Sequence, residues 1–311
     1  MLAYALRRLA LFPLVLFGMY AGAVLLVMAA PGEGLEGGER DLPPEVLAAR
    51  RAAFNYDEPW WQRYFWTWPK RLVWDQDLPA HEYPDWTVVE IMRSALPVSL
   101  QLGLLAFTIA VLLGIGVGVL AAATRGRWVD HLSLALTLVG VVLPTFVTGS
   151  VLLLIFAVWL RAAPVGGWGR PDQALLPAFT LALPYAAYIA RLTRAALLDA
   201  YAEDYIRTAR AKGLSETRVM FDHALRNALL PVLSYLGPAA AALFTGSFVV
   251  ERIFTIPGMG THVVESINNR DQSLILATVL VYGVFLAAFN LVVDLLYGLA
   301  DPRIRVGASG G

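Results

Sequence analysis

The sequence predicts an all-α integral membrane protein with six transmembrane helices. Hydrophobic residues make up 58% of the 311 residues and charged residues only 15%, whereas soluble domains carry about 25% charged residues. Mean hydropathy is +0.61. Six apolar runs also reach the roughly 20 residues that an α-helix needs to cross the hydrocarbon core. The runs lie at about residues 9–29, 98–123, 131–160, 174–198, 229–250 and 273–299.

The composition also excludes several classes of protein. The chain has no cysteine, which removes disulfides, thiolate nucleophiles and cysteine-based metal sites. Its 24 basic and 24 acidic residues balance, so no net positive field attracts nucleic acid. The four histidines, at positions 81, 131, 223 and 262, are not spaced as metal ligands. We therefore expect no nucleic-acid partner, no metal and no cofactor in this chain.

The first apolar run, Leu9 to Ala29, follows Arg7 and Arg8. A cleaved signal peptide also begins with basic residues and ends with small ones. The apolar core of a signal peptide spans about 7–15 residues, however, which is shorter than this run. We interpret residues 1–30 as a retained N-terminal transmembrane helix.

Residues 31–97 form the one long segment between apolar runs, and we expect an extracytoplasmic cap there. Pro43-Pro44 marks a turn, and Glu45 to Phe54 has the composition of a short helix. Aromatic residues with scattered charges suit a unit at the membrane interface. Two roles stay open, because the cap either packs over helix ends or contacts substrate directly. Its tryptophans include Trp60, Trp61, Trp66, Trp68 and Trp74.

Basic residues in the short loops predict the orientation, because Lys and Arg resist translocation. One side of the membrane would carry 13 basic residues and the other only four. We therefore expect a multi-pass protein of the cytoplasmic (inner) membrane with both termini cytoplasmic. Residues 98–305 would form a five-helix core, followed by a flexible tail at 306–311. The 13 are Arg7, Arg8, Arg125, Arg127, seven residues of the 191–228 loop, Arg303 and Arg305; the four are Arg161, Arg170, Arg252 and Arg270.

The predicted cytoplasmic loop at 199–228 has the pattern of a helix, a break and a second helix. Acidic residues come early and basic ones late in the first helix, which complements the helix dipole. Gly213 stands where a left-handed residue ends a helix, and Ser215 is a good N-cap for the next helix. Leu214 and Val219 occupy the two positions of a hydrophobic staple. The pattern predicts a rigid corner at Gly213.

A capped corner of this kind offers a compact docking surface for another protein. It combines apolar with charged side chains, and an apolar corner on the surface is typical of an interaction site. A solvated connector between two spans is the alternative, and it would explain only the charges. The apolar residues are Leu214, Val219, Met220 and Phe221, and the charged ones are Lys212, Glu216 and Arg218.

Four stretches of this sequence resemble the permease subunits of ABC importers, in their dipeptide and oligopeptide branch. Tyr205 to Leu214 (YIRTARAKGL), together with His223 to Pro231 (HALRNALLP), resembles the EAA loop of that family. The resemblance covers about residues 87–305 and implies a type I ABC importer permease core. The other three are Leu143 to Phe146 (LPTF), similar to a third-helix motif, Glu251 to Gly260 (ERIFTIPGMG), similar to the loop before the last helix, and Asn290 to Arg305 (NLVVDLLYGLADPRIR), similar to a C-terminal signature.

The resemblance implies both a role for the loop and a set of partners. The EAA loop of the family forms coupling helices that seat in a groove of the ATPase subunit. The implied partners are a second homologous permease, two ABC ATPase domains that bind ATP and magnesium, an extracytoplasmic substrate-binding protein and membrane lipid. Arg226-Asn227 is similar to the first of the two permeases in peptide systems. The residues expected to couple to the ATPase are Ala209, Lys212, Gly213, Leu214, Ser215, Glu216, Arg218 and Val219.

Two departures from the family pattern bear on function. The general motif has Glu where Arg207 stands, and the family's Gly-Asp-Leu-Gly-Ser turn is absent near Asp77-Leu78. The family transports di- and oligopeptides, while relatives move nickel chelates or oligosaccharides. Peptide is therefore the expected substrate class, and the length of the peptide, a nickel chelate and an oligosaccharide are left open.

No motif in the sequence supplies catalysis within this chain. Its only lysines, Lys70 and Lys212, do not stand in a G-x-x-x-x-G-K-[ST] phosphate-binding loop. The G-x-S-x-G and H-E-x-x-H motifs of hydrolases are also absent from the sequence. We therefore expect a subunit that is not an enzyme and whose energy comes from a separate ATPase.

Polar and aromatic residues within the spans are candidates for a translocation path, because polar groups in hydrocarbon are costly. Prolines 144, 184, 231 and 238 would kink the spans and free carbonyl groups. Asp294 is the one acid inside a span. A proton relay through it would make the chain a secondary transporter, and a non-transporting scaffold that docks a cytosolic partner is the third possibility. The path candidates are Thr145, Phe146, Tyr185, Tyr188, Ser234, Thr245 and Asn290.

Overall fold

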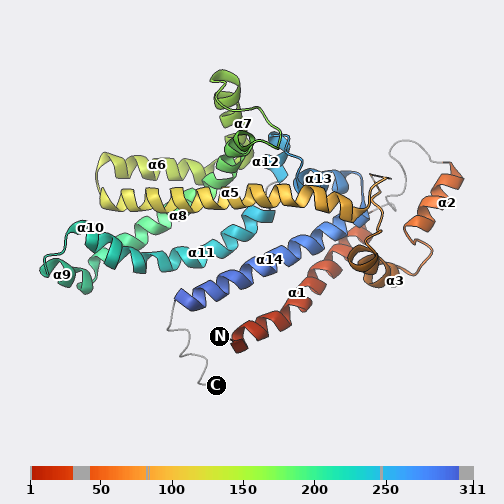
Figure 1. The fold of residues 1–311 in the computed structure, drawn as a ribbon, viewed down its shortest axis with the longest axis horizontal. Helices are drawn as coiled ribbons and strands as arrows, with labels where there is room; N and C mark the ends of the chain where they lie inside the picture. Colours follow the sequence, from red (N-terminus) through yellow and green to blue (C-terminus); the bar gives the residue numbers. More distant parts are fainter. Residues whose placement is uncertain (1, 31–42, 82, 84, 246–247, 301–311) are drawn as a thin grey trace.

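The structure, a computed structural model, describes residues 2–30, 43–81, 83, 85–245 and 248–300. Within these residues the chain is helical, with one isolated β-bridge between Pro79 and Thr87. Helices α9 (Asp204–Ala211) and α10 (Glu216–Arg218) lie at one end of the molecule, and the helices of residues 44–75 lie at the other (Figure 1). The prediction of an all-α fold is confirmed.

Five helices of the described chain are long and apolar enough to cross a membrane, and a bent helix pair supplies a sixth. Each of them coincides with one of the six apolar runs, and the number of spans reaches the predicted six when the bent pair is counted as one span. The five are α1 (Leu2–Ala29), α5 (Val88–Ala123), α8 (Pro171–Ala202), α11 (Leu225–Thr245) and α14 (Gln272–Ala300).

The third apolar run forms two helices instead of one continuous span. Helix α6 (Trp128–Val142) ends before Pro144, and a second helix runs from Thr145 to Trp159, at 112° to the first. Its first part is α7 (Thr145–Leu152). Leu143 is extended, at φ −74° and ψ 128°, because a residue that precedes proline is disfavoured in the helical region. Of the four prolines expected to kink the spans, Pro144 lies at this break, whereas Pro184, Pro231 and Pro238 lie inside helices that continue through them.

Helix α5 begins at Val88, ten residues before the start of the apolar run at residue 98. A capping box fixes this start: the Glu90 N–H donates to Thr87 Oγ1 at 3.2 Å, and the Thr87 N–H donates to Glu90 Oε2 at 2.8 Å. Residues 88–97, which the sequence placed in the cap, therefore belong to α5, a helix of 36 residues. The first part of α5 contains polar residues, so an argument from hydropathy does not detect that it is helical.

Helices α5 and α8 form the most extensive helix pair, and small residues let them approach closely. A Cβ at Gly118 of α5 would lie 2.6 Å from the Ala190 carbonyl oxygen, and one at Gly114 would lie 2.6 Å from Ile189 Cβ. Apolar side chains gain little by leaving lipid, so close van der Waals packing supplies the attraction between membrane helices. Gly114 and Gly118 are therefore required by the contact itself.

The predicted cap is a helical unit that packs on α1 and on the start of α14. Helix α2 (Pro44–Ala53) is followed by a second helix over residues 60–75, which includes α3 (Trp60–Gln62) and π-helical turns. Trp68 and Tyr64 are fully buried in this unit, whereas Trp60 and Trp61 are about half exposed, at 47% and 58%. Of the tryptophans named in the predicted cap, Trp68 is therefore the buried one, whereas Trp60 and Trp61 lie at the exposed start of the helix.

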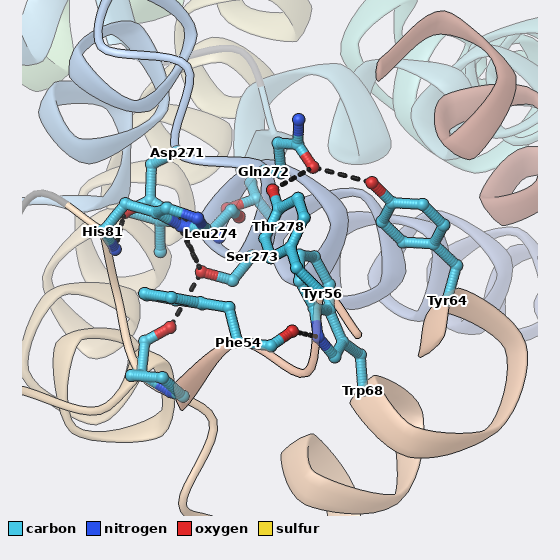
Figure 2. Close-up of polar contacts among 11 residues, drawn as sticks. Phe54, Tyr56, Tyr64, Trp68, His81, Asp271, Gln272, Ser273, Leu274 and Thr278 are labelled. Atoms are coloured by element: carbon cyan, nitrogen blue, oxygen red, sulfur yellow. Dashed lines mark hydrogen bonds and ion pairs between the residues drawn. The ribbon is translucent and has the colours of Figure 1, made fainter. Parts of the chain in front are cut away.

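Buried hydrogen bonds join the cap to the first turn of α14 (Figure 2). Tyr56 Oη and Tyr64 Oη both donate to Gln272 Oε1, at 3.0 and 2.7 Å. The His81 N–H donates to Asp271 Oδ2 at 2.8 Å. Burial alone would raise the pKa of the Asp271 carboxyl, but the hydrogen bonds from His81, Leu274 and Ser273 hold it below its ordinary value. The cap is thus fastened over the N-terminal end of α14.

Candidate functional site

The corner predicted at Gly213 is present and has the hydrogen bonds of a Schellman motif. Gly213 has φ +79°, the left-handed conformation that favours glycine. Its N–H donates to the Arg210 carbonyl oxygen at 2.9 Å, and the Leu214 N–H donates to the Ala209 carbonyl oxygen at 3.4 Å. These two bonds satisfy the last carbonyl groups of α9 and reverse the chain at its end.

Ser215 is the N-cap of the second helix, but only its backbone takes part in the capping. Ser215 has the extended conformation of an N-cap, and the Val219 N–H donates to its carbonyl oxygen at 2.9 Å. The serine hydroxyl makes no capping hydrogen bond, which differs from the expectation. The helix then continues through a π-helical stretch, Val219–Ala224, directly into α11. The corner is therefore mechanically continuous with a membrane span.

A small apolar cluster supports the corner from inside. Val219 and Ile206 are fully buried and Ala209 is 5% exposed, while Leu214 is half-buried against the same cluster. Leu197 of α8 and Ala122 of α5 also belong to it. Ala209 and Val219 were expected on the docking surface. The structure instead buries both side chains, because the hydrophobic staple turns Val219 inward. They therefore support the corner from inside and are not part of its exposed surface.

The outward face of the corner consists of exposed charged residues and one aromatic ring. Lys212, Ser215, Glu216 and Arg218 are exposed, and the Phe221 side chain is 50% exposed. Glu216 does not project freely, because Arg210 Nε and Nη2 donate to its two carboxylate oxygens at 2.7 and 3.1 Å. This pair bridges the two arms of the corner on its solvent side. The exposed surface of the corner thus combines Lys212, Arg218 and the Arg210–Glu216 pair with the half-exposed Phe221.

The candidate path residues do not all gather in one place. Tyr188 of α8 lies 4.3 Å from Tyr235 of α11, measured between ring centroids, and Ser234 is exposed beside Tyr235. Ser234 Oγ donates to the carbonyl oxygen of Leu230 at 3.1 Å, a bond within its own helix. Of the others, Tyr185 also lies on α8, Thr145 is half-buried and Phe146 exposed at the start of α7, and Asn290 is half-buried on α14. The side chains of Thr245 and Asp294 lie outside the described part of the structure.

One buried polar contact was missed by the argument from sequence. Glu251 of α12 (Phe248–Ile253) is fully buried, and its Oε1 accepts from Ser99 Oγ of α5 at 2.7 Å. Its Oε2 accepts from the Gly260 N–H at 2.7 Å, in the first turn of α13 (Met259–Asn268). A Cβ at Gly258 or Gly260 would come within 2.7 Å of this carboxyl group. The only signal for it was the stretch ERIFTIPGMG itself, whose Glu and Gly residues this contact explains.

The helical core, the bent pair and the corner define the class of protein as a type I ABC importer permease. Two solved transporters share this fold. The inward-facing methionine ABC transporter MetNI is 16% identical with a TM-score of 0.55, over 68% of this chain and 97% of that one. An amino acid ABC transporter solved with histidines is 22% identical with a TM-score of 0.53, over 67% and 94%.

The chain belongs to the family described as the binding-protein-dependent transport system inner membrane component, whose model matches residues 114–306. The oligopeptide transport system permease protein OppB of Haemophilus influenzae is 41% identical over 98% of this chain and 100% of its own length. The OppB protein of Escherichia coli K12 is 41% identical over the same shares. The dipeptide transport system permease protein DppB of Bacillus subtilis is 40% identical over 88% of each chain. The family assigned from the EAA-like loop is confirmed.

Proposed function

We propose that this chain is the permease subunit of an ATP-driven importer of di- or oligopeptides, with both termini cytoplasmic. The observation that carries the proposal is the Schellman corner at Gly213, which joins α9 to the helix that continues into α11 and has Lys212, Arg218 and Phe221 exposed. The near full-length likeness to permeases named for oligopeptide and dipeptide transport supports the peptide substrate. The short-loop charges support the orientation.

In this proposal the corner transmits movement from an ATPase to the spans. An ATPase domain that contacts the exposed Lys212, Arg218 and Phe221 would move a unit whose corner at Gly213 is closed by two backbone hydrogen bonds. The buried cluster around Val219 ties that unit to α8 and α5, and the helix beyond Val219 is α11 itself. A rigid-body shift of the corner is therefore passed to three spans. Such shifts are a common way of coupling one site to another.

The remaining parts of the transporter come from other chains. A second homologous permease would complete the pore, two ABC ATPase domains would bind ATP and magnesium, and an extracytoplasmic binding protein would deliver the peptide. This chain supplies no phosphate-binding loop of its own, so ATP hydrolysis is assigned to the partners. Three candidates support a translocation path between α8 and α11, where the rings of Tyr188 and Tyr235 are in contact. They are Tyr185, Tyr188 and Ser234.

The direct test is transport by the reconstituted assembly. The chain would be purified by an affinity tag from cells that express the neighbouring permease, ATPase and binding-protein genes, and sealed into proteoliposomes. We expect the ATPases to copurify and labelled di-, tri- and pentapeptides to enter only with ATP and binding protein present. A nickel chelate and an oligosaccharide serve as controls for substrate class.

Two outcomes would contradict the proposal. Uptake driven by a proton gradient without ATP would indicate the secondary transporter, and copurification without any uptake or substrate-stimulated ATP hydrolysis would indicate the scaffold. ATP-driven uptake of the chelate or the oligosaccharide in place of peptides would agree with an ATP-driven importer but contradict the proposed peptide substrate.

A further inference from the structure

An apolar groove of about 510 Å³ opens between α5, α6, α7 and α8. Its wall is aliphatic and aromatic apart from Thr137 and Thr148. The groove follows α8 from Phe179 to Ala190, on the side of that helix that α6 only partly covers. A water-filled substrate path would need polar groups along its wall, so this groove suits hydrocarbon better than a peptide.

The groove leads toward two arginines, Arg191 and Arg194. Val117, Thr137 and Ala190 also line a smaller pocket that continues in the direction of the α5–α6 turn, and this pocket reaches Arg191 and Arg194. From Phe179 to Arg191 the helix rises by about 18 Å at about 1.5 Å per residue, and one leaflet of hydrocarbon is about 15 Å thick. The groove is therefore about one leaflet deep, with positive charge at one end.

Most of that positive charge is not neutralised by the chain itself. Arg194 forms a salt bridge with Asp130. Its Nε and Nη2 donate to the two carboxylate oxygens at 2.7 and 2.8 Å. Arg191, Arg125 and Arg127 are exposed, and none of the three pairs with a carboxylate within the described residues. The contact that the structure gives Arg191 is its guanidinium carbon 5.4 Å from the ring centroid of Tyr188. Three arginines thus remain for an anionic partner.

A second apolar groove among the described residues differs in the charged residue that lines it. A groove of about 620 Å³ lies between α5, Phe156 and the first turns of α8, and it shares Leu113 and Phe179 with the first one. It ends at Asp172, which pairs with Arg170. The exposed Arg161 precedes Ala162 at the edge of that groove but is not among its lining residues, whereas Arg191 itself lines the pocket at the α5–α6 turn.

We propose that the groove between α5, α6, α7 and α8 holds an anionic phospholipid of the leaflet nearer the α5–α6 turn. One acyl chain lies along α8 between Phe179 and Ala190, and the phosphate is bound by Arg191 with Arg125 and Arg127 beside it. Arginine guanidinium groups match phosphate oxygens in geometry and charge. The 74% exposed Trp128 lies next to Arg127, where indole rings favour the headgroup region. The inference is independent of the substrate proposed above.

The test measures which lipid occupies the groove in the assembled transporter. The chain has no cysteine of its own, so Val139→Cys, at the mouth of the groove, gives a single site in this chain for a fluorophore, with any cysteines of the partner subunits removed. The labelled assembly is placed in phosphatidylcholine vesicles that contain brominated phosphatidylglycerol or brominated phosphatidylcholine. We expect phosphatidylglycerol to quench at a several-fold lower mole fraction. Each arginine near an anionic surface contributes about fivefold to lipid affinity.

The variants identify the groups responsible. Arg191→Gln and Arg127→Gln together should remove most of the preference for phosphatidylglycerol, whereas Arg226→Gln, an exposed arginine on α11 away from the groove, should leave it intact. Equal quenching by the two lipids in the unmodified chain overturns the proposal without reliance on any variant. Absence of quenching by either lipid also overturns it, because the groove would then be covered by the second permease.

Discussion

At the scale of single residues, Gly213 combines a left-handed backbone with open surroundings. No atom lies within 4 Å of a Cβ built on it, so a substitution there changes conformational energy without a clash. The left-handed conformation costs a residue with a Cβ about 1–2 kcal/mol, and a β-branched residue more. Asparagine tolerates this conformation. Gly213→Val should therefore lower ATPase copurification and ATP-driven uptake, and Gly213→Asn should keep most of both. Equal activity of the two variants and the unmodified chain would remove the corner from the coupling mechanism.

Glu251 is the second residue whose role is local and testable. In Glu251→Leu the Ser99 hydroxyl and the Gly260 N–H would lose their buried acceptor, and each unsatisfied group costs roughly 1–3 kcal/mol. We expect a clear loss of thermal stability in detergent for Glu251→Leu, and also a loss for Ser99→Ala, because the buried Met259 N–H donates to Ser99 Oγ at 2.8 Å and would lose its acceptor. Unchanged melting of Glu251→Leu would show that the contact does not hold α12 and α13 against α5.

At the scale of elements, the α5–α8 pair depends on the absence of side chains at the contact. Gly118→Val would place atoms against the Ala190 carbonyl and Thr193, and overpacking of this kind typically costs about 1–3 kcal/mol. Gly116 on the exposed side of the same helix is a matched control, since a Cβ there meets nothing within 4 Å. Gly118→Val should lower the yield of folded protein and its melting temperature, with Gly116→Val close to the unmodified chain. The reverse order would contradict the packing described above.

The cap is the second element with a distinct prediction. Trp68 is 1% exposed and donates from Nε1 to the Phe54 carbonyl oxygen at 3.0 Å. Trp68→Ala should destabilise the cap by about 3–5 kcal/mol, as for a fully buried Trp, whereas the half-exposed Trp61→Ala should have a much smaller effect. Limited proteolysis of the 31–97 segment would measure both. If uptake per folded molecule falls for Trp61→Ala while proteolysis is unchanged, the cap contacts substrate and does not only pack over α14.

At the scale of the whole molecule, the proposed orientation rests on charges that lie far apart in the sequence. A cysteine at Trp61, 58% exposed in the cap, should react with an impermeant reagent added to intact cells. One at Ser215, exposed in the corner, should react only after the cells are opened. The absence of native cysteine makes the background clean. Labelling of Ser215→Cys from outside would reverse the topology inferred from the short loops.

The sequence by itself determined the features that depend on a few neighbouring residues. The six spans follow from the length of apolar runs, since every backbone group in hydrocarbon must be satisfied within its own helix. The corner at Gly213 follows from capping chemistry, which acts over one turn on either side, and Pro144 carried the signal for the break between α6 and α7. The family could be assigned because its motifs are themselves short.

Only the tertiary structure decided which side chains of those segments meet. Ser99 and Glu251 are 152 residues apart in sequence, and Tyr56 and Gln272 are 216 apart, so no periodicity connects them. Val219 could be counted as docking surface or as core until the buried cluster with Ile206 placed it inside. Burial and long-range hydrogen bonds depend on how helices pack in three dimensions. The pattern along the chain marks the apolar and polar positions, and the packing of the helices selects the partner of each.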